Sequence, residues 1–160
     1  MIVVSNTTPI LSLNKVGLLY ILRELFGQVF VPKAVYNEIT VLGKGKQGDA
    51  IFNIAAFIQI KDIQNAMAAS LLISQLDYGE AESIVLAGEL KANILLLDEK
   101  KARKIAKAYN QEVIGTIGVI QMAKNKGLIP VIKLYLDELI KNGIWIERRL
   151  YQSVLDNNNE

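Results

Sequence analysis

The sequence has 160 residues, of which 51% are hydrophobic and 21% charged, and it contains no histidine and no cysteine. These absences exclude disulfides, thiolate zinc sites, cysteine nucleophiles and Ser-His-Asp hydrolases. The net charge of +2 is too small to indicate a nucleic-acid-binding protein by itself, so the position of the positive charge matters more than its sum.

The first part of the chain predicts a strand followed by two helices. Residues 2–5 are a hydrophobic strand. Thr7 or Thr8 is expected to cap the next helix, with Pro9 in its first turn. The amphipathic run 18–26 predicts a second helix, which ends at a glycine.

The next part predicts two strands that flank a glycine-rich stretch. A short strand at 29–31 precedes a helix that begins at Pro32 and contains Glu38. Residues 43–48 predict a flexible loop, which lacks the GxxxxGK[ST] spacing of a phosphate-binding loop. Residues 57–63 alternate as a strand does, with helical stretches on both sides.

The second half continues the alternation. Helices are predicted at 80–90 and 99–109, and strands at 94–97 and 112–114. Two further helices follow, separated by Gly127 and Pro130, and a last helical turn or two surrounds Leu150 and Val154. Strands that alternate with helices predict an α/β protein, a three-layer α/β/α sandwich around a mainly parallel sheet.

One domain over residues 1–155 with a polar tail at 156–160 is the simplest organisation for this length. The longest uncharged stretch, 63–76, is too short to span a bilayer, so no membrane association is expected. Met1 leads directly into a strand, which predicts no signal peptide and a cytoplasmic protein.

Glu38 is the best single candidate for a functional acid. At about 100° per residue it falls in the same stripe as Ala34, Val35 and Ile39, where an unpaired carboxylate is costly. The alternative is a glutamate at the edge of the stripe that reaches solvent or a lysine.

Glu80 and Glu82 compete for a second acidic position. Asp77 and Glu80 fit a capping box, but Glu80 also heads an inward row with Ile84. Glu82 shares its side of the helix with Glu89, a more solvent-like setting, and ranks second.

Asn6 and Asp98 follow two hydrophobic strands. Ligands bind beyond the carboxyl ends of parallel strands, so a ligand role is favoured for Asp98 over a helix cap. Asn6 has a strong alternative as a turn former. Together with Glu38 and Glu80, these residues suit a hard divalent cation, and the geometric prediction is that Glu38, Glu80 and Asp98 meet in one pocket.

The helix after Asp98 is markedly basic, with positive residues at Lys100, Lys101, Arg103, Lys104 and Lys107. A solvated helix face is the usual explanation for such a run. Since the run begins beside the predicted metal site, binding of a nucleic-acid backbone is the competing explanation.

Taken together, these segments resemble the PIN-domain superfamily, in particular its VapC-like, uncharacterised PIN-like branch. The resemblance covers nearly the whole chain and is carried by residues 3–10, 31–38, 79–87, 95–98 with 102–103, 115–118 and 123–129.

The resemblance implies a small nuclease in which acidic residues bind Mg²⁺ or Mn²⁺ and cleave single-stranded RNA. It places the acidic positions on Asn6, Glu38, Glu80 and Asp98, with Glu82 as the alternative to Glu80. Thr7, Lys100, Lys101, Arg103 and Thr116 are the implied contacts to the RNA backbone. A small antitoxin and a homodimer are the implied protein partners.

Asn6 departs from the family pattern, in which an aspartate is expected. The amide keeps a coordinating oxygen but removes a negative charge, so metal affinity is expected to fall. The alternative is therefore a weakly active or inactive PIN-like module that binds RNA or protein. A nucleotide-binding α/β domain of another kind is a third hypothesis, against which stands the lack of a glycine-rich turn after the first strand.

Several apolar residues are open to two interpretations, as core or as a dimer face, with core as the default: Leu18, Leu22, Phe26, Trp145 and Tyr151.

Overall fold

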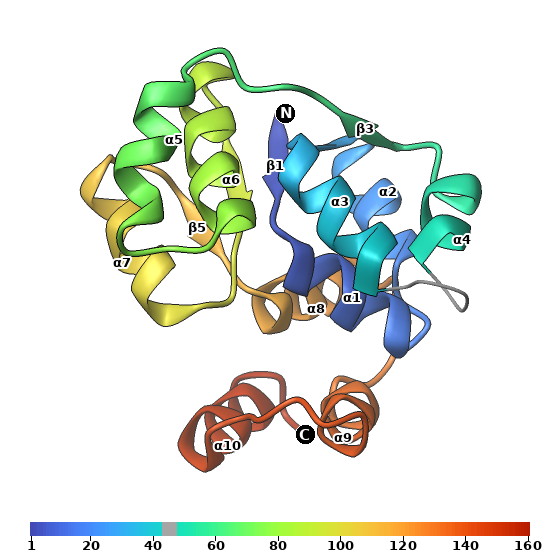
Figure 1. Cartoon of the computed structure of the whole chain (residues 1–160). Coiled ribbons are helices and arrows are strands. Elements are labelled where there is room, and N and C mark those ends of the chain that lie inside the picture. The colour runs from blue at the N-terminus through green and yellow to red at the C-terminus, as the bar shows by residue number, and fades with distance from the viewer. Residues whose placement is uncertain (43–47) are drawn as a thin grey trace.

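The structure, a computed structural model, describes residues 1–42 and 48–160 and contains a five-stranded, all-parallel sheet (Figure 1). The strand order is β3-β2-β1-β4-β5. The strands are β1 (Val3–Ser5), β2 (Val29–Val31), β3 (Ile58–Ile60), β4 (Ile94–Leu96) and β5 (Val113–Ile114). The predicted α/β/α sandwich with a parallel sheet is confirmed.

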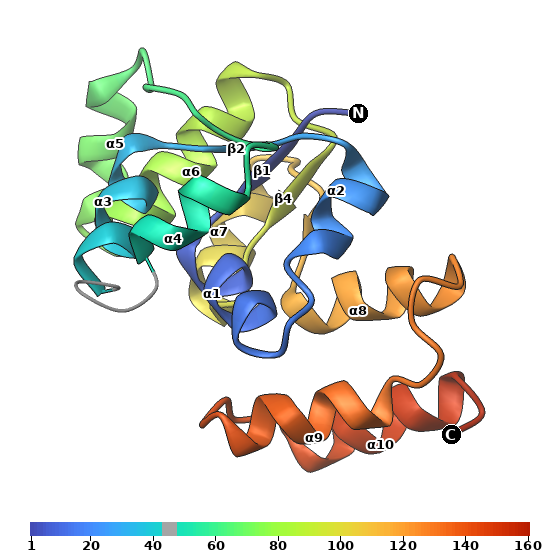
Figure 2. The ribbon, with the colours of Figure 1, turned by 90° about the vertical axis from the view of Figure 1, so that its right-hand side faces the viewer.

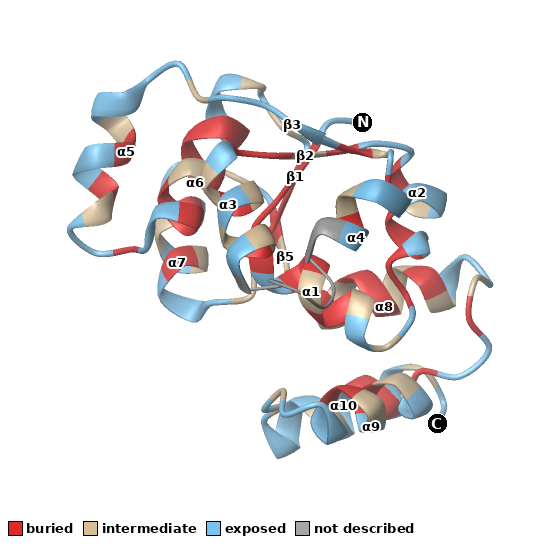
Figure 3. Cartoon of the chain, turned by 45° about the vertical axis from the view of Figure 1, so that its right-hand side comes forward, coloured by how far each residue is buried: buried red, intermediate tan, exposed pale blue. Residues whose placement is uncertain are grey.

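The central strand β1 is buried on both faces because successive side chains point to opposite sides of a strand. Val3 belongs to one hydrophobic cluster and Val4 to the other, and both are fully buried. The neighbouring strand β4 divides in the same way, with Leu95 facing one cluster and Leu96 the other. Figure 3 shows the buried strands between the two helical layers.

Helices cover both faces of the sheet. The layer that packs with Val3 contains α1 (Thr7–Lys15), α2 (Tyr20–Phe26), α3 (Lys33–Leu42), α4 (Gly48–Ile54) and α8 (Thr116–Asn125). The layer that packs with Val4 contains α5 (Ala66–Ile73), α6 (Tyr78–Glu89) and α7 (Lys100–Ala108). None of the helices in residues 1–42 and 48–160 is long and apolar enough to cross a lipid bilayer.

Two C-terminal helices, α9 (Lys133–Lys141) and α10 (Arg148–Asn157), lie side by side beyond α8 (Figure 2). They pack on the hydrophobic cluster that contains Val3, through buried side chains such as Leu136 and Leu139 of α9 and Val154 of α10. The core interpretation is therefore right for Leu18, Leu22 and Phe26, which are all buried, whereas Trp145 is 84% exposed and Tyr151 is half-buried.

The cap of α1 differs from the prediction. Asn6, in extended conformation, is the N-cap residue, and the expectation that Thr7 or Thr8 caps this helix is wrong. Thr7 is already the first helical residue, and its hydroxyl donates to Glu38 instead. The flexible loop predicted at 43–48 lies outside the described residues except at Gly48, where α4 begins.

The last residues are tied to the rest of the fold. Helix α10 extends to Asn157, and Glu160 accepts hydrogen bonds from Ile132 N at 2.8 Å and Lys133 N at 2.9 Å. Glu160 thereby supplies acceptors to the N-terminal turn of α9, which has no side-chain cap of its own. The division into a domain and a polar tail remains a prediction, but this tail carries a structural contact.

Candidate metal and nucleic-acid site

The strand order reverses direction beside β1. From β1 the chain builds β2 and β3 on one side, and it then returns to place β4 on the other side. Asn6, which follows β1, donates its backbone N–H to Leu96 O at 3.0 Å, two residues before Asp98. Asn6 and Asp98 therefore flank the crevice where open parallel sheets bind their ligands.

The Asn6 side chain carries an unsatisfied oxygen. The residue is only 4% exposed, and its Oδ1 has no hydrogen-bond partner among the described residues. The turn-forming hydrogen bond, which was the alternative reading of Asn6, is therefore not formed. A buried carbonyl oxygen without a donor is unfavourable, so this atom is suited to accept a ligand such as a cation.

Glu38 is held by two donors from different parts of the chain. The residue is half-buried on α3; Thr7 Oγ1 donates to its Oε2, and Gly79 N donates to its Oε1 at 3.0 Å. The glycine is required by this approach, because a Cβ at residue 79 would lie 2.7 Å from Glu38 Oε2. Glu38 thus joins the beginning of α1 to the beginning of α6, rather than reaching out to a lysine.

Glu80 combines a structural and an inward-facing position. It completes a capping box with Asp77, in which Glu80 N donates to Asp77 Oδ1 at 2.7 Å and Asp77 N donates to Glu80 Oε2 at 3.1 Å. The residue is nonetheless only 8% exposed. Burial raises the pKa of Glu80, the hydrogen bond from Asp77 N opposes this, and the negative charges of Asp77, Glu99 and Glu38 raise it further.

Glu82 has a different contact. Its Oε2 accepts a hydrogen bond from Ala34 N at 2.9 Å, at the start of α3. A carboxylate in this position accepts from an N–H group that has no partner within the helix. Its negative charge is also stabilised by the positive end of the helix dipole. The contact gives Glu82 a structural task, as the capping box does for Glu80, and Glu80 is the more buried of the two.

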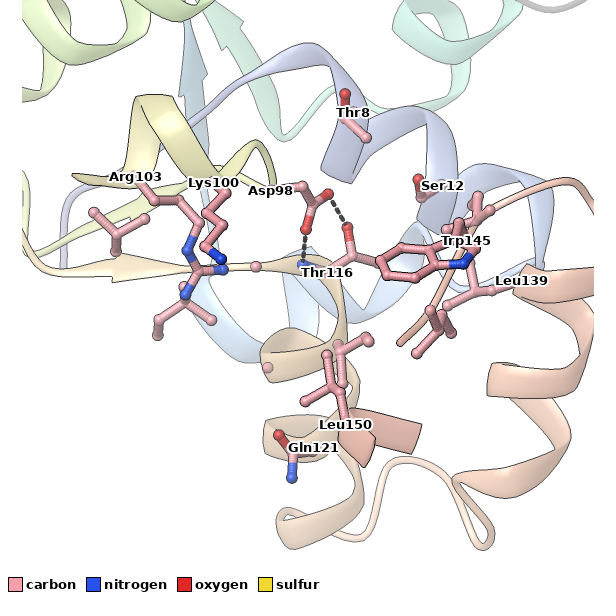
Figure 4. Close-up of a pocket in the computed structure, with 17 residues that line it drawn as sticks. Thr8, Ser12, Asp98, Lys100, Arg103, Thr116, Gln121, Leu139, Trp145 and Leu150 are labelled. Atoms are coloured by element: carbon pink, nitrogen blue, oxygen red, sulfur yellow. Dashed lines mark hydrogen bonds between the residues drawn. The ribbon is translucent and has the colours of Figure 1, made fainter. Parts of the chain in front are cut away.

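Asp98 is held by Thr116 at the N-terminus of α8 (Figure 4). Thr116 N donates to Oδ1 at 2.7 Å, and Thr116 Oγ1 donates to Oδ2 at 2.6 Å. The helix-capping alternative for Asp98 does not apply to α7, because Glu99 is the N-cap there and accepts from Ala102 N at 3.0 Å. Thr116 is 5% exposed and both of its hydrogen bonds to Asp98 orient that acid, while its contact with RNA stays a prediction.

A cleft of about 560 Å³ opens beside Asp98. Lys100 and Arg103 line it on the side of α7, where Arg103 Nη1 also donates to Leu97 O at 3.4 Å. Lys101, Lys104 and Lys107 are exposed along the same helix. The basic helix thus begins at the site and faces solvent, so both interpretations of its charge remain compatible with its position.

The acidic residues form two groups. Glu38, in the middle of α3, contacts the start of α6, where Glu80 lies, whereas Asp98 is paired with Thr116. In the described part of the chain, no group of three acidic side chains is close enough to hold a metal ion. The prediction that Glu38, Glu80 and Asp98 meet in one pocket therefore stays a prediction. Asn6 lies between the two groups. Its neighbour Thr7 donates to Glu38, and its own N–H donates to Leu96 O, two residues before Asp98.

The comparison with known protein families decides the family. A family model described as PIN domain matches residues 2–160. This chain belongs to the PIN-domain family. The PIN domain is a nuclease-type fold whose members generally use divalent metals and interact with nucleic acids. No curated protein matches the chain.

In donor chemistry, although not in the spacing of the described side chains, the candidate residues of this PIN domain suit a hard divalent cation. Mg²⁺ and Mn²⁺ prefer carboxylate, carbonyl and water oxygens, which Asn6, Glu38, Glu80 and Asp98 provide. The unpartnered Oδ1 of Asn6 is the observation in favour of such an ion. The hydrogen bonds to Glu38 and Asp98 leave further lone pairs on each carboxylate and fix its orientation.

Three features around the candidate site of this PIN domain were not identified from the sequence. Glu99 contributes to the field at Glu80, Gly79 admits Glu38 to the start of α6, and Trp145 lines the cleft beside Asp98. Gly79 and Glu99 directly precede and follow predicted site residues, which was a usable signal. Trp145 had none, since its place depends on how α9 and α10 pack.

Proposed function

We propose that this PIN-domain protein is a Mg²⁺- or Mn²⁺-dependent ribonuclease that cleaves single-stranded RNA. The observation that supports this most is the buried, unpartnered Oδ1 of Asn6, which lies at the switch point of the sheet. Glu38, Glu80 and Asp98 would hold the ion together with this oxygen. When bound, the ion would supply positive charge that activates a water molecule and stabilises the leaving oxygen.

The residues around the acids set their orientation. Thr7 and Gly79 fix the Glu38 carboxylate, and Thr116 fixes the Asp98 carboxylate with two hydrogen bonds. Oriented carboxylates lose less entropy when they bind a cation. Lys100, Lys101 and Arg103 would neutralise the RNA backbone next to the acids.

A PIN-like binding module without turnover is the second candidate. Two observations favour it: an amide stands at residue 6, and no three acidic residues are grouped in the described part of the chain. Such a module would bind RNA or a small antitoxin-like protein through the same surface. An antitoxin partner and a homodimer remain predictions under both candidates.

The test is a Mn²⁺ titration of the purified protein combined with cleavage of single-stranded RNA, with and without EDTA. We expect cleavage that EDTA abolishes. The variant Glu38→Gln should reduce it more than about 100-fold, since even the loss of a residue that only orients a ligand costs about 10–100-fold. Glu89→Gln is the matched control, because residue 89 lies at the far end of α6 from Glu80 and a glutamine still accepts from Gln64 N.

Asn6→Asp separates the two candidates. If the wild type binds Mn²⁺ and cleaves RNA, the added charge should tighten binding, and the ribonuclease is supported. If the wild type is inert and Asn6→Asp gains both properties, the native protein is the binding module. Cleavage that survives EDTA, or that is unchanged in Glu38→Gln, would contradict the proposed site.

A further inference from the structure

The cleft beside Asp98 has two walls of different chemistry (Figure 4). Lys100 and Arg103 of α7 stand on one side of the Asp98–Thr116 pair in this view, and Trp145 stands on the other. The volume of about 560 Å³ is in the range of about 300–1,000 Å³ that is usual for small organic ligands. Neither the proposed ion nor its ligands account for the half of the cleft that contains Trp145.

Trp145 is held outward by its neighbours. It lies in the segment between α9 and α10, where Ile144 and Ile146 pack against the core cluster on either side of it. The segment is anchored at its start, because Gly143 has a φ of +86° and Ile144 N donates to Leu139 O at 3.0 Å. Ile144 and Ile146 also line the cleft, so this segment forms one wall of it, with the two isoleucines packed on the core and Trp145 exposed between them.

The exposure of Trp145 has no structural explanation in the chain. The residue is 84% exposed, although tryptophan has the largest apolar side chain, and it is the only tryptophan in the sequence. Single exposed apolar residues are common, but this one lines a cleft that also contains cationic groups. Neither Lys100 nor Arg103 forms an ion pair with a carboxylate of the described residues, so both retain charge for a ligand.

An aromatic face opposite cationic groups is the combination that binds a nucleotide of a single strand. Every base has a π-face that stacks on an aromatic ring, and its phosphate is neutralised by lysine or arginine. In a duplex, the bases stack on each other and do not present a free face. An apolar peptide segment would leave the charges of Lys100 and Arg103 without partners, which is unfavourable.

We propose that this cleft is a nucleotide subsite, in which Trp145 stacks on an unpaired base of single-stranded RNA while Lys100 and Arg103 neutralise its phosphate. The inference deepens the proposed ribonuclease function and rests on it for the choice of RNA as the ligand. The subsite would hold the nucleotide next to the phosphate that lies at Asp98. Stacking predicts tolerance of base identity and a requirement for an unpaired base.

The test measures binding separately from cleavage, with the full chain, a short single-stranded oligouridylate and EDTA present. The fluorescence of Trp145 should be quenched on titration, since this is the only tryptophan. By anisotropy of the labelled oligonucleotide, Trp145→Ala should bind about 5- to 150-fold more weakly, and Trp145→Phe should restore most of the affinity. Leu134→Ala is the control, an exposed apolar residue of α9 that does not line the cleft.

The outcomes distinguish this inference from the proposed function. Quenching and weaker binding by Trp145→Ala, without metal-dependent cleavage, would support the subsite and remove the ribonuclease. Cleavage by the wild type with unchanged binding in Trp145→Ala would leave the ribonuclease and overturn the subsite. Equal quenching by a duplex of the same length, or no oligonucleotide binding at all, would also overturn it.

Discussion

Gly79 is a residue at which the absence of a side chain matters for the proposed site. A Cβ there would lie 2.7 Å from Glu38 Oε2, whereas a Cβ at Gly88 of the same helix would be 3.6 Å from its nearest neighbour, Gln111 Nε2. Gly88→Ala should therefore increase the free energy of unfolding by about 0.5–1 kcal/mol, through helix propensity alone. Gly79→Ala should instead displace Glu38 and weaken Mn²⁺ binding by at least about 10-fold.

Urea denaturation and a Mn²⁺ titration of both variants check this prediction. Gly88→Ala is the control for the effect of an alanine in α6, and its Mn²⁺ affinity should equal that of the wild type. Unchanged Mn²⁺ affinity in Gly79→Ala would show that Glu38 is not a ligand.

Glu80 should destabilise the fold at neutral pH. Burial raises its pKa above the ordinary value of 4.5, and the charges of Asp77, Glu99 and Glu38 add to the effect. The folded state therefore holds this proton more tightly than the unfolded chain, so the contribution of Glu80 to stability falls as the pH rises from 4.5 through the folded pKa. A buried carboxylate that costs stability is typical of a functional position.

Glu80→Gln removes the charge and keeps the acceptor of the capping box. We expect a higher melting temperature than that of the wild type at neutral pH, and a difference that shrinks once the pH is below 4.5. Thermal unfolding followed by circular dichroism over this pH range measures it. A lower melting temperature for the variant at neutral pH would mean that the capping role of the carboxylate outweighs its burial.

At the scale of single residues, a local pattern predicted the burial of a side chain but not its contacts. Glu38 lay in an apolar stripe, and the structure buries it partly and supplies it with donors from Thr7 and Gly79. The contacts themselves were out of reach, since Gly79 N and Glu38 are 41 positions apart in sequence. The pairing of Asp98 with Thr116 depends in the same way on β4 and β5 being neighbours.

At the scale of elements, the N-terminus of α9 is capped by Glu160, which lies after the end of α10. Burial raises the pKa of Glu160, but the hydrogen bonds from Ile132 N and Lys133 N and the contact with Lys124 outweigh this and lower it overall. Glu160→Ala should cost about 1 kcal/mol of the free energy of unfolding, as the loss of a helix cap does.

The pH dependence of this cost has a definite sign. A lowered folded pKa means that Glu160 stabilises the fold above 4.5 and loses its contribution as the pH falls through the folded pKa. Urea denaturation at neutral and acidic pH measures the effect, with Asp156→Ala as an exposed control close by. An equal and small effect of both variants would show that residue 160 is a free tail.

Most elements were predicted because hydrophobic periodicity is a local property. The strand ends were less accurate: 57–63 was expected and Ile58–Ile60 is observed, because pairing with β2 limits the ladder. The cap of α1 was predicted wrongly because the Thr7 hydroxyl donates to Glu38 instead of capping the helix. This is a tertiary contact that the local sequence pattern does not contain.

At the scale of the whole molecule, the sheet is buried between two helical layers. Val3 and Val4 are consecutive in β1, yet each belongs to a different hydrophobic cluster. Val3→Ala and Val4→Ala should each lower the free energy of unfolding by about 2 kcal/mol, from lost methyl groups and the cavity left behind. Ile60→Ala should cost less, since Ile60 is 44% exposed on the edge strand β3.

Urea unfolding of the three variants tests the layered arrangement. A large effect for only one of the two valines would mean that one face of β1 is open. The three layers followed from the alternation of strands and helices, but the strand order did not, because no local pattern states which strands become neighbours.

The placement of β1 has a consequence for synthesis on the ribosome. Ile2 N donates to Asn93 Oδ1 across 91 positions of sequence, so β1 is translated long before its second neighbour, β4, exists. Until then its apolar edge is open to association with other nascent chains. Asn6, Asp98 and Thr116 come together only after β5 has been translated. An incomplete polypeptide therefore lacks the Asp98–Thr116 pair, and its hazard during translation is aggregation.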